Sequence, residues 1–217
     1  MVKRKIIFCS ESRGLTQYPA KPPEKYSIDG EAIMSLFKNN MMALRSESVE
    51  MEAIGFVGKE NFMEKVPNFV RNKFAEFRSR SQEIEIFLIA LRDADTNDGK
   101  KISSLRRKLT EKIKKLVDEQ EFKRVRIMFA VQAIEAWILA DEKKLNEYLK
   151  VTNIKHENEP EKIGNPKLII QNHFERCGRK YTSQELLPLL QAESLLRGKH
   201  FRELYTCVQQ ITEASVQ

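Results

Sequence analysis

The chain has 217 residues and a formal net charge of +7, with 41% hydrophobic and 32% charged residues. This composition is typical of a folded globular domain with at most one appendage, and it excludes disorder as the main state. No apolar run approaches the ~18 residues of a membrane span. The cysteines Cys9, Cys177 and Cys207 are too widely spaced for a metal motif or a disulfide framework, so we expect a cytoplasmic protein without membrane association.

Four short apolar runs predict buried strands, and they alternate with helical patterns. The strands are expected at 5–9, 53–57, 84–91 and 125–131. Helices are expected after Asp29, at 61–78 with Pro67 in the first turns or at a bend, at about 100–116, and at 133–149. Because the strand runs are continuously apolar and separated by helices, they favour a parallel sheet covered on both faces.

The last third of the chain has a different character. Residues 151–164 are polar and contain Pro160 and Gly164, which is typical of a linker. Leucine-rich helical patterns follow at 165–176, 183–197 and 199–212. We therefore predict an α/β domain over 1–150 and a linker with a helical extension over 151–217.

The positive charge is concentrated in one segment. Residues 100–126 contain eleven basic and four acidic side chains, a surplus equal to that of the whole chain. The segment is either a solvated helix face or a surface for an anionic partner.

Carboxylates stand where three of the predicted strands end. The first strand ends at Glu11, the third at Asp93-Ala94-Asp95, and the fourth leads to Glu135. The carboxyl ends of parallel strands meet at one edge of a sheet, where ligands bind in such folds. Residues two apart on an extended strand point the same way at roughly 6–7 Å, and two ionised carboxylates at such a distance repel by about 3 kcal/mol at an effective dielectric near 20. A divalent cation removes that cost, and oxygen ligands suit Mg²⁺ or Mn²⁺.

A structural role is the alternative for these acids. Thr96-Asn97-Asp98-Gly99 is a turn signature, so Asp95 or Asp98 can instead be the N-cap of the basic helix. The occurrence of Glu11 and Glu135 at matching strand ends favours a site over a cap.

A strand that ends in Glu, followed by a later strand that ends in Asp-x-Asp, resembles the Toprim fold of topoisomerases, primases and OLD-type nucleases. The residues that carry this resemblance are Glu11 and Asp93-Ala94-Asp95. The segment 126–141, with Glu135 and Trp137, resembles a signature of a bacterial family of Toprim-like proteins. Asn165-Pro166-Lys167 and Tyr181 resemble the helical tail of that family. Glu11 is followed by Ser12, where members usually have Gly.

The resemblance implies a fold, an activity and partners. The fold is a Toprim-like three-layer α/β/α domain with a mainly parallel four-stranded sheet and a C-terminal helical extension. The activity is Mg²⁺- or Mn²⁺-dependent hydrolysis of phosphodiesters by a nuclease or nucleic-acid-processing protein. Such proteins often occur beside ATPases in apparent anti-phage loci, which suggests nucleic acid and an ATPase as partners.

The same resemblance implies roles for individual residues. Asp93 and Asp95 bind the metal, Glu11 acts as general acid or base or helps to hold a second metal, and Glu135 is a further ligand or orients a water. Arg92, Lys100 and Lys101 hold the substrate backbone.

Two other functions remain open at this point. Asp93-Ala94-Asp95-Thr96 matches the D-x-D-x-T element of haloacid-dehalogenase-type phosphatases, with Asp93 as nucleophile and Asp95 as acid or base. In the other alternative the chain is a non-catalytic partner of an ATPase, and its acids are structural.

Overall fold

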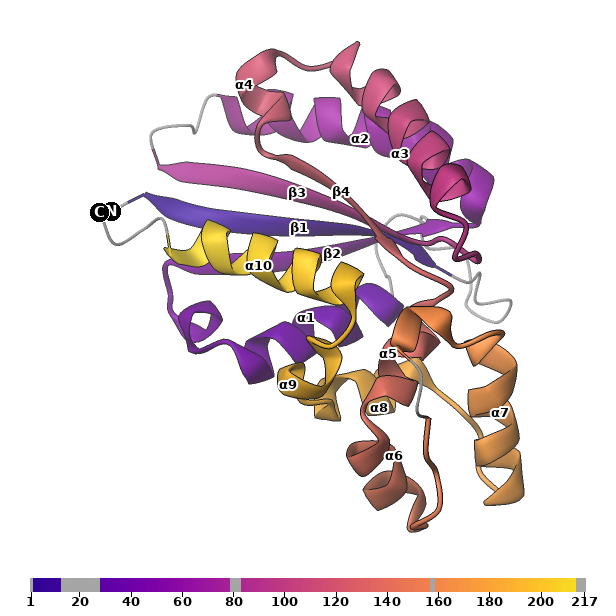
Figure 1. Ribbon diagram of the computed structural model, residues 1–217. Coiled ribbons are helices and arrows are strands. Elements are labelled where there is room, and N and C mark those ends of the chain that lie inside the picture. Colours follow the sequence, from indigo (N-terminus) through magenta and orange to yellow (C-terminus); the bar gives the residue numbers. More distant parts are fainter. Residues whose placement is uncertain (1, 13–27, 79–82, 157–158, 214–217) are drawn as a thin grey trace, which may run out of the picture.

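The computed structural model describes residues 2–12, 28–78, 83–156 and 159–213 (Figure 1). Its centre is a sheet of four strands in the order β2-β1-β3-β4, and all neighbouring strands are parallel. The strands are β1 (Lys3–Ser12), β2 (Val49–Val57), β3 (Ile84–Asp93) and β4 (Val125–Ala130). The predicted α/β fold with a parallel four-stranded sheet is therefore confirmed, and β1 and β3 form its interior.

Helices that follow consecutive strands cover one face of the sheet. They are α2 (Lys59–Arg78), α3 (Gly99–Lys114) and the short α4 (Glu119–Phe122) (Figure 1). Their apolar side chains, among them Phe62, Phe74 and Leu109, pack on Ile7 and Leu88 of the central strands. Helix α2 begins before residue 61, so Pro67 lies in its buried interior and not in its first turns.

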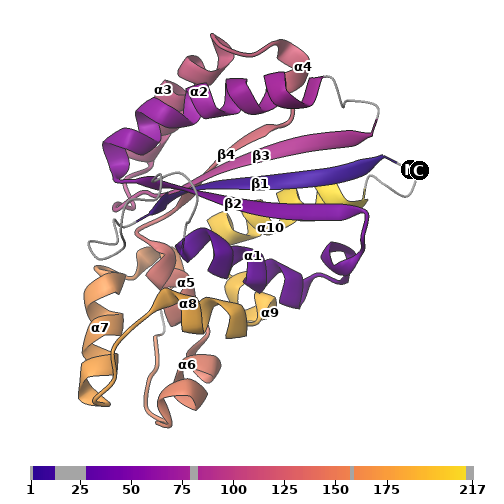
Figure 2. The ribbon, with the colours of Figure 1, turned by 180° about the vertical axis from the view of Figure 1, so that it is seen from behind.

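The opposite face is covered by segments from both ends of the chain. Helices α1 (Ile28–Asn40) and α10 (Lys199–Glu213) lie against it side by side (Figures 1 and 2). The ring of Phe37 stacks on Phe8 of β1 at 5.9 Å between centroids and on Phe201 of α10 at 6.0 Å. Phe201 also meets Trp137 edge to face at 5.1 Å. The aromatic side chains thus join the sheet, the first helix and the last helix.

The helix predicted over 133–149 is two helices. They are α5 (Ile134–Ala140) and α6 (Glu142–Leu149), with Asp141 between them. The Asp141 carboxylate accepts hydrogen bonds from the backbone N–H of Lys144 at 3.3 Å and of Gln191 at 2.8 Å. It therefore caps α6 and ties the helix start to the C-terminal segment, which is why the chain turns there.

The predicted helix at 183–197 is also wrong as a single element. The segment forms α8 (Ser183–Leu186), a 3₁₀ turn (Leu187–Leu189) and α9 (Ala192–Leu195). Pro188 lacks the N–H that a continuing α-helix needs, so the chain changes direction at this point. Two further 3₁₀ turns lie at Met42–Arg45 and Pro160–Lys162, and α7 spans Pro166–Arg176.

The C-terminal helices share one apolar core with the sheet. Phe174, Leu186, Leu195 and Phe201 belong to the cluster that contains Phe8 of β1. The division of the chain at residue 150 stays a prediction from composition. In the described ranges, no helix has both the length and the apolar character that crossing a membrane requires.

Candidate functional site at the carboxyl edge of the sheet

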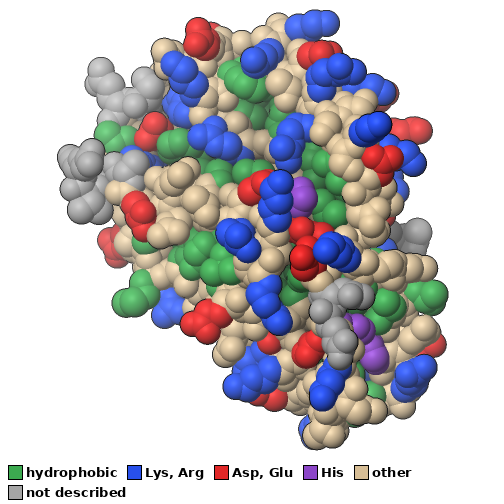
Figure 3. Space-filling model, viewed as in Figure 1, with side chains coloured by type: hydrophobic (Ala, Val, Ile, Leu, Met, Phe, Trp, Pro, Cys, Tyr) green, Lys and Arg blue, Asp and Glu red, His purple; other side chains and the backbone are tan. Residues whose placement is uncertain are grey.

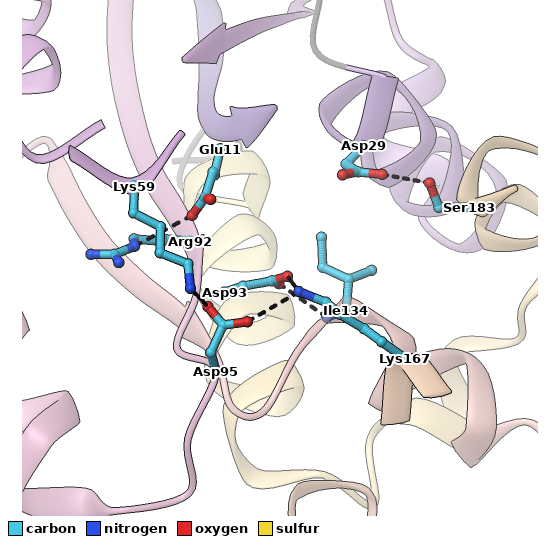
Figure 4. Close-up of polar contacts among 9 residues, drawn as sticks. All are labelled: Glu11, Asp29, Lys59, Arg92, Asp93, Asp95, Ile134, Lys167 and Ser183. Atoms are coloured by element: carbon cyan, nitrogen blue, oxygen red, sulfur yellow. Dashed lines mark hydrogen bonds and ion pairs between the residues drawn. The ribbon is translucent and has the colours of Figure 1, made fainter. Parts of the chain in front are cut away.

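The four parallel strands bring their carboxyl ends to one edge of the sheet. Glu11 stands at the end of β1, Lys59 starts the helix after β2, and Asp93 ends β3. Ile134 starts the helix after β4. Figure 4 shows these residues together, with Lys167 reaching them from α7.

Glu11 and Arg92 form a pair on the α2–α3 side of the sheet. In the β1–β3 register Cys9 lies opposite Ala90, and both pack in the core beneath α2 and α3. Since side chains alternate along a strand, Glu11 and Arg92 point to this same side. The Arg92 Nε atom lies 3.4 Å from Glu11 Oε2, and only 8% of the Arg92 side chain is exposed. Burial raises the pKa of Glu11, although the Arg92 charge opposes this.

Asp93 points to the other side of the sheet, where it joins two elements. Its Oδ1 accepts a hydrogen bond from the Ile134 N–H at 3.1 Å, at the start of α5. Its Oδ2 lies 2.9 Å from the Lys167 Nζ. Burial raises the pKa of Asp93, and the Lys167 ammonium opposes that rise. The carboxylate therefore fixes the position of α5 and receives a cation from the C-terminal part of the chain.

Asp95 lies beyond the end of β3 in a left-handed backbone conformation, with φ of 49°. The expectation that Asp93 and Asp95 point the same way along an extended strand is therefore wrong. Asp95 Oδ1 lies 3.1 Å from the Lys167 Nζ, and its Oδ2 lies 2.6 Å from the Lys59 Nζ. Burial favours a higher pKa for Asp95, but the two lysines outweigh it and the pKa is lowered.

The cap of the basic helix is Asp98 and not Asp95. Asp98 Oδ1 accepts hydrogen bonds from the backbone N–H of Lys100 at 2.9 Å and of Lys101 at 3.3 Å. Of the two structural roles that the turn signature allowed, only the one for Asp98 is present. Asp95 instead pairs with Lys59 and Lys167.

Lys167 is the cation that joins Asp93 to Asp95. It lies in the first turn of α7, after Asn165 in a left-handed conformation and Pro166 as a helix-starting residue. Its pKa is raised: burial lowers it, but the charges of Asp93, Glu135 and Asp95 outweigh burial. Glu135 lies in the first turn of α5 with 4% exposure. Three carboxylates thus act on one ammonium group.

The structure brings together most, but not all, of the predicted site residues. Asp93 and Asp95 share one cation, Glu135 acts on that same cation, and Glu11 contacts Arg92. Arg92 was predicted to hold substrate, and in the structure it is the partner of Glu11.

The side chains of Lys100 and Lys101 contact none of these acids among the described residues. Helix α3 starts near the edge and runs back along the sheet (Figure 1), so most of the basic segment lies away from the acids. On the face drawn in Figure 3, Lys and Arg side chains are spread over the surface and mixed with acidic ones.

Sequence reasoning missed two residues of the centre, Lys59 and Lys167. Lys59 follows Gly58 directly after the second strand, near a strand end as the acids are. Lys167 lay in the Asn165-Pro166-Lys167 segment, which the resemblance had singled out without giving the lysine a role. Lys59 would have been found by considering every charged residue at a strand end, and not only the acidic residues.

The donor atoms at the centre fit one divalent cation. Asp93 Oδ2 and Asp95 Oδ1 lie 2.9 and 3.1 Å from the same nitrogen atom, so both oxygens face a single cation position. Carboxylate oxygens are the ligands that Mg²⁺ and Mn²⁺ prefer. Within the described ranges, no three His, Cys, Asp or Glu side chains are grouped as a ready metal-ligand set. A metal ligated by both oxygens would therefore take the place of the Lys167 ammonium.

The fold and this edge define a parallel α/β protein with a centre of paired acids and cations at the carboxyl ends of its strands. Residues 31–197 match the family described as "Domain of unknown function (DUF4276)", and the chain belongs to this family. The matched region includes Lys59, Asp93, Asp95, Glu135 and Lys167 and begins after Glu11. Comparisons with curated proteins and with solved structures found no match.

Proposed function

We propose that this protein is a Mg²⁺- or Mn²⁺-dependent phosphodiester hydrolase that acts on nucleic acid. The observation that carries the proposal is the convergence of Asp93 and Asp95 on one cation position, 2.9 and 3.1 Å from their oxygens. The likeness to Toprim proteins and nucleases, a cytoplasmic location and an ATPase partner in phage defence belong to the same proposal.

The residues of the chain divide the work of such a reaction. Asp93 and Asp95 hold the metal, and the hydrogen bond from Ile134 fixes the Asp93 carboxylate in place. A bound Mg²⁺ or Mn²⁺ would neutralise charge on the phosphate and lower the pKa of the attacking water. Glu135 is close enough to act on the same cation position, and Glu11 serves as the proton acceptor or donor on the other side.

The cations around the acids suit a phosphate substrate. Lys59 is half exposed, with 51% of its side chain accessible, and it stands at the start of a twenty-residue helix. The N-terminus of a helix attracts phosphate through its free N–H groups and its dipole. Lys59 therefore lies where a phosphodiester oxygen would approach Asp95.

The test is cleavage of single-stranded and double-stranded DNA and RNA in Mg²⁺ and in Mn²⁺. We expect the parent to cleave at least one of these substrates, and Asp93→Ala and Asp95→Ala to lose about a thousandfold of that activity. Asp118→Ala, which removes an acid that caps α4, is the matched control and should cleave like the parent. Equal cleavage by both site variants and the parent would remove the proposal.

One contact favours a second candidate, a phosphatase of the haloacid-dehalogenase type. In that chemistry Asp93 is the nucleophile and Asp95 the acid or base, and Lys167 would be the later lysine that orients the nucleophile, because its Nζ lies 2.9 Å from Asp93. Hydrolysis of small phosphate monoesters without cleavage of nucleic acid would favour this candidate. If Mn²⁺ causes no thermal shift and no hydrolysis is found, the non-catalytic partner role is favoured instead.

A further inference from the structure

The Lys167 ammonium occupies a position that the carboxylates of both Asp93 and Asp95 face. Its Nζ lies 2.9 Å from Asp93 and 3.1 Å from Asp95, and 32% of its side chain is exposed (Figure 4). Lys59 pairs with the other oxygen of Asp95, Oδ2, and is 51% exposed. The two lysines are therefore not equivalent, because only Lys167 lies between the acids.

An ammonium and a divalent ion cannot share this position. A metal ligated by both oxygens would sit about 2.0–2.2 Å from each of them, within the space that the Lys167 Nζ fills. Two positive charges at a few ångströms repel strongly in a partly buried setting. Binding of the metal therefore requires that Lys167 withdraw.

We propose that Lys167 is a built-in competitor for the divalent cation, so that metal binding at Asp93 and Asp95 breaks the ion pairs that tie the first turn of α7 to the sheet edge. This inference rests on the proposed function. It adds that metal binding is weakened by the chain's own ammonium and is coupled to the C-terminal segment.

The construction of α7 suits a local release. The middle of the helix is anchored by Ile170 and Phe174, which are 0% and 1% exposed in the main core. Its first turn follows Asn165 in a left-handed conformation, and the Lys167 pairs tie it to the edge of the sheet. Withdrawal of Lys167 therefore removes the charged ties of the first turn, while the buried Pro166, Ile170 and Phe174 keep the helix docked.

The experiment measures Mn²⁺ binding by calorimetry in the full chain and in three variants. Lys167→Met removes the charge and keeps the length, and it should bind Mn²⁺ about tenfold more tightly. Lys167→Arg retains a competing cation and should stay within about twofold of the parent. Lys162→Met, at an exposed lysine that pairs with Glu159, is the matched control and should bind like the parent.

Hydrogen exchange gives an independent readout, measured on the parent and on Lys167→Met. With saturating Mn²⁺, amides of the α7 first turn should exchange faster in the parent and should not respond in Lys167→Met. The amides around Phe174 should exchange at the same rate with and without Mn²⁺. Circular dichroism confirms that each variant folds, and Lys167→Gln replaces Lys167→Met if the latter does not.

The outcomes separate the inference from the proposed function. If parent and Lys167→Met bind Mn²⁺ equally, or if the variant binds it more weakly, Lys167 is not a competitor while a metal site remains. Unchanged exchange at the α7 start in Mn²⁺-loaded parent also overturns the inference. If neither protein binds Mn²⁺, the proposed metal-dependent function fails together with the inference.

Discussion

The two faces of the sheet are assembled differently, and the candidate site draws on both. One face is covered by α2, α3 and α4, which follow one another along the chain between residues 59 and 122. The other is covered by α1 and α10, whose sequences lie near opposite ends of the chain. The first face contributes Lys59, and the second brings Lys167 and the start of α5 to Asp93. A local layer is visible in the sequence, whereas a layer built from distant segments becomes visible only in three dimensions.

The ion pairs of the helix surface and of the sheet edge also differ in how exposed they are. On α3, Arg107 and Glu111 are 3.9 Å apart and 74% and 62% exposed. At the edge, Asp93 and Lys167 are 2.9 Å apart and 17% and 32% exposed. Exposed pairs contribute about 0–1 kcal/mol to stability, while partly buried pairs with hydrogen bonds are costly to break. The basic surplus therefore marks a surface, and the paired charges mark the site.

The largest expected effect tests whether the layer that contains α10 is integral to the fold. Phe201→Ala on α10 and Phe74→Ala on α2 both remove a ring that is at most 2% exposed. Each should lower the free energy of unfolding by about 3–5 kcal/mol, measured by urea denaturation. If the C-terminal extension folds apart from the sheet, Phe201→Ala will leave the main unfolding transition unchanged.

The next effect compares an acid of the site with an acid of the surface. Asp93→Ala leaves the Ile134 N–H without its acceptor and removes one of the two carboxylates that pair with Lys167, so we expect a loss of about 2 kcal/mol in unfolding free energy. Asp118→Ala removes an N-cap and should cost about 1 kcal/mol. A larger loss for Asp118→Ala would contradict the difference between the two regions.

A smaller effect is expected from the basic segment, 100–126, and it tests which part of that segment binds nucleic acid. Lys100 and Lys101 start α3 near the edge, whereas Lys112 and Lys115 lie at its far end. Changing the near pair to Gln should reduce the slope of log affinity against log salt by about 2, since each phosphate contact contributes about 0.9. The far pair, changed in the same way, is the control. Equal slopes for both double variants would show that the whole helix face binds or that none of it does.

The smallest expected effect is on the pH dependence of stability, and it comes from two histidines outside the candidate site. His156 and His173 meet edge to face at 5.4 Å, and burial lowers the pKa of each. The unfolded chain therefore binds protons at a higher pH than the folded chain. The contribution of these two histidines to the free energy of unfolding should be fully present above about pH 6.5. It should fall as the pH drops below that value. His173→Gln should make this fall shallower in urea denaturation between pH 7 and 5, and an unchanged slope would contradict it.

Much of the fold follows from sequence because its signals are local. The runs around Ile6 and Ile89 are continuous and apolar, and both form interior parallel strands. The breaks at Asp141 and Pro188 were not foreseen. The Asp141 carboxylate caps α6 and also accepts a hydrogen bond from the distant Gln191, a contact that the sequence does not show. The leucine pattern of 183–197 concealed the effect of the proline.

The candidate site was only partly predictable for the same reason. The position of Asp93 and Asp95 at a strand end is a local signal, and the structure places both at the sheet edge. The left-handed backbone at Asp95 and the approach of Lys167 depend on tertiary packing across 72 residues of sequence. Such contacts leave no periodic trace in a single sequence.

The contact between the first strand and the last helix has a consequence for synthesis of the chain. Arg4 on β1 donates a hydrogen bond to the carbonyl of Ile211, a separation of 207 residues. A nascent chain therefore carries one apolar face of its sheet only partly covered, by α1, until α10 has left the ribosome, and pairings between distant segments form slowly. During that interval we expect the part of this face that α10 covers to bind chaperones, and truncated chains that end before α10 should aggregate.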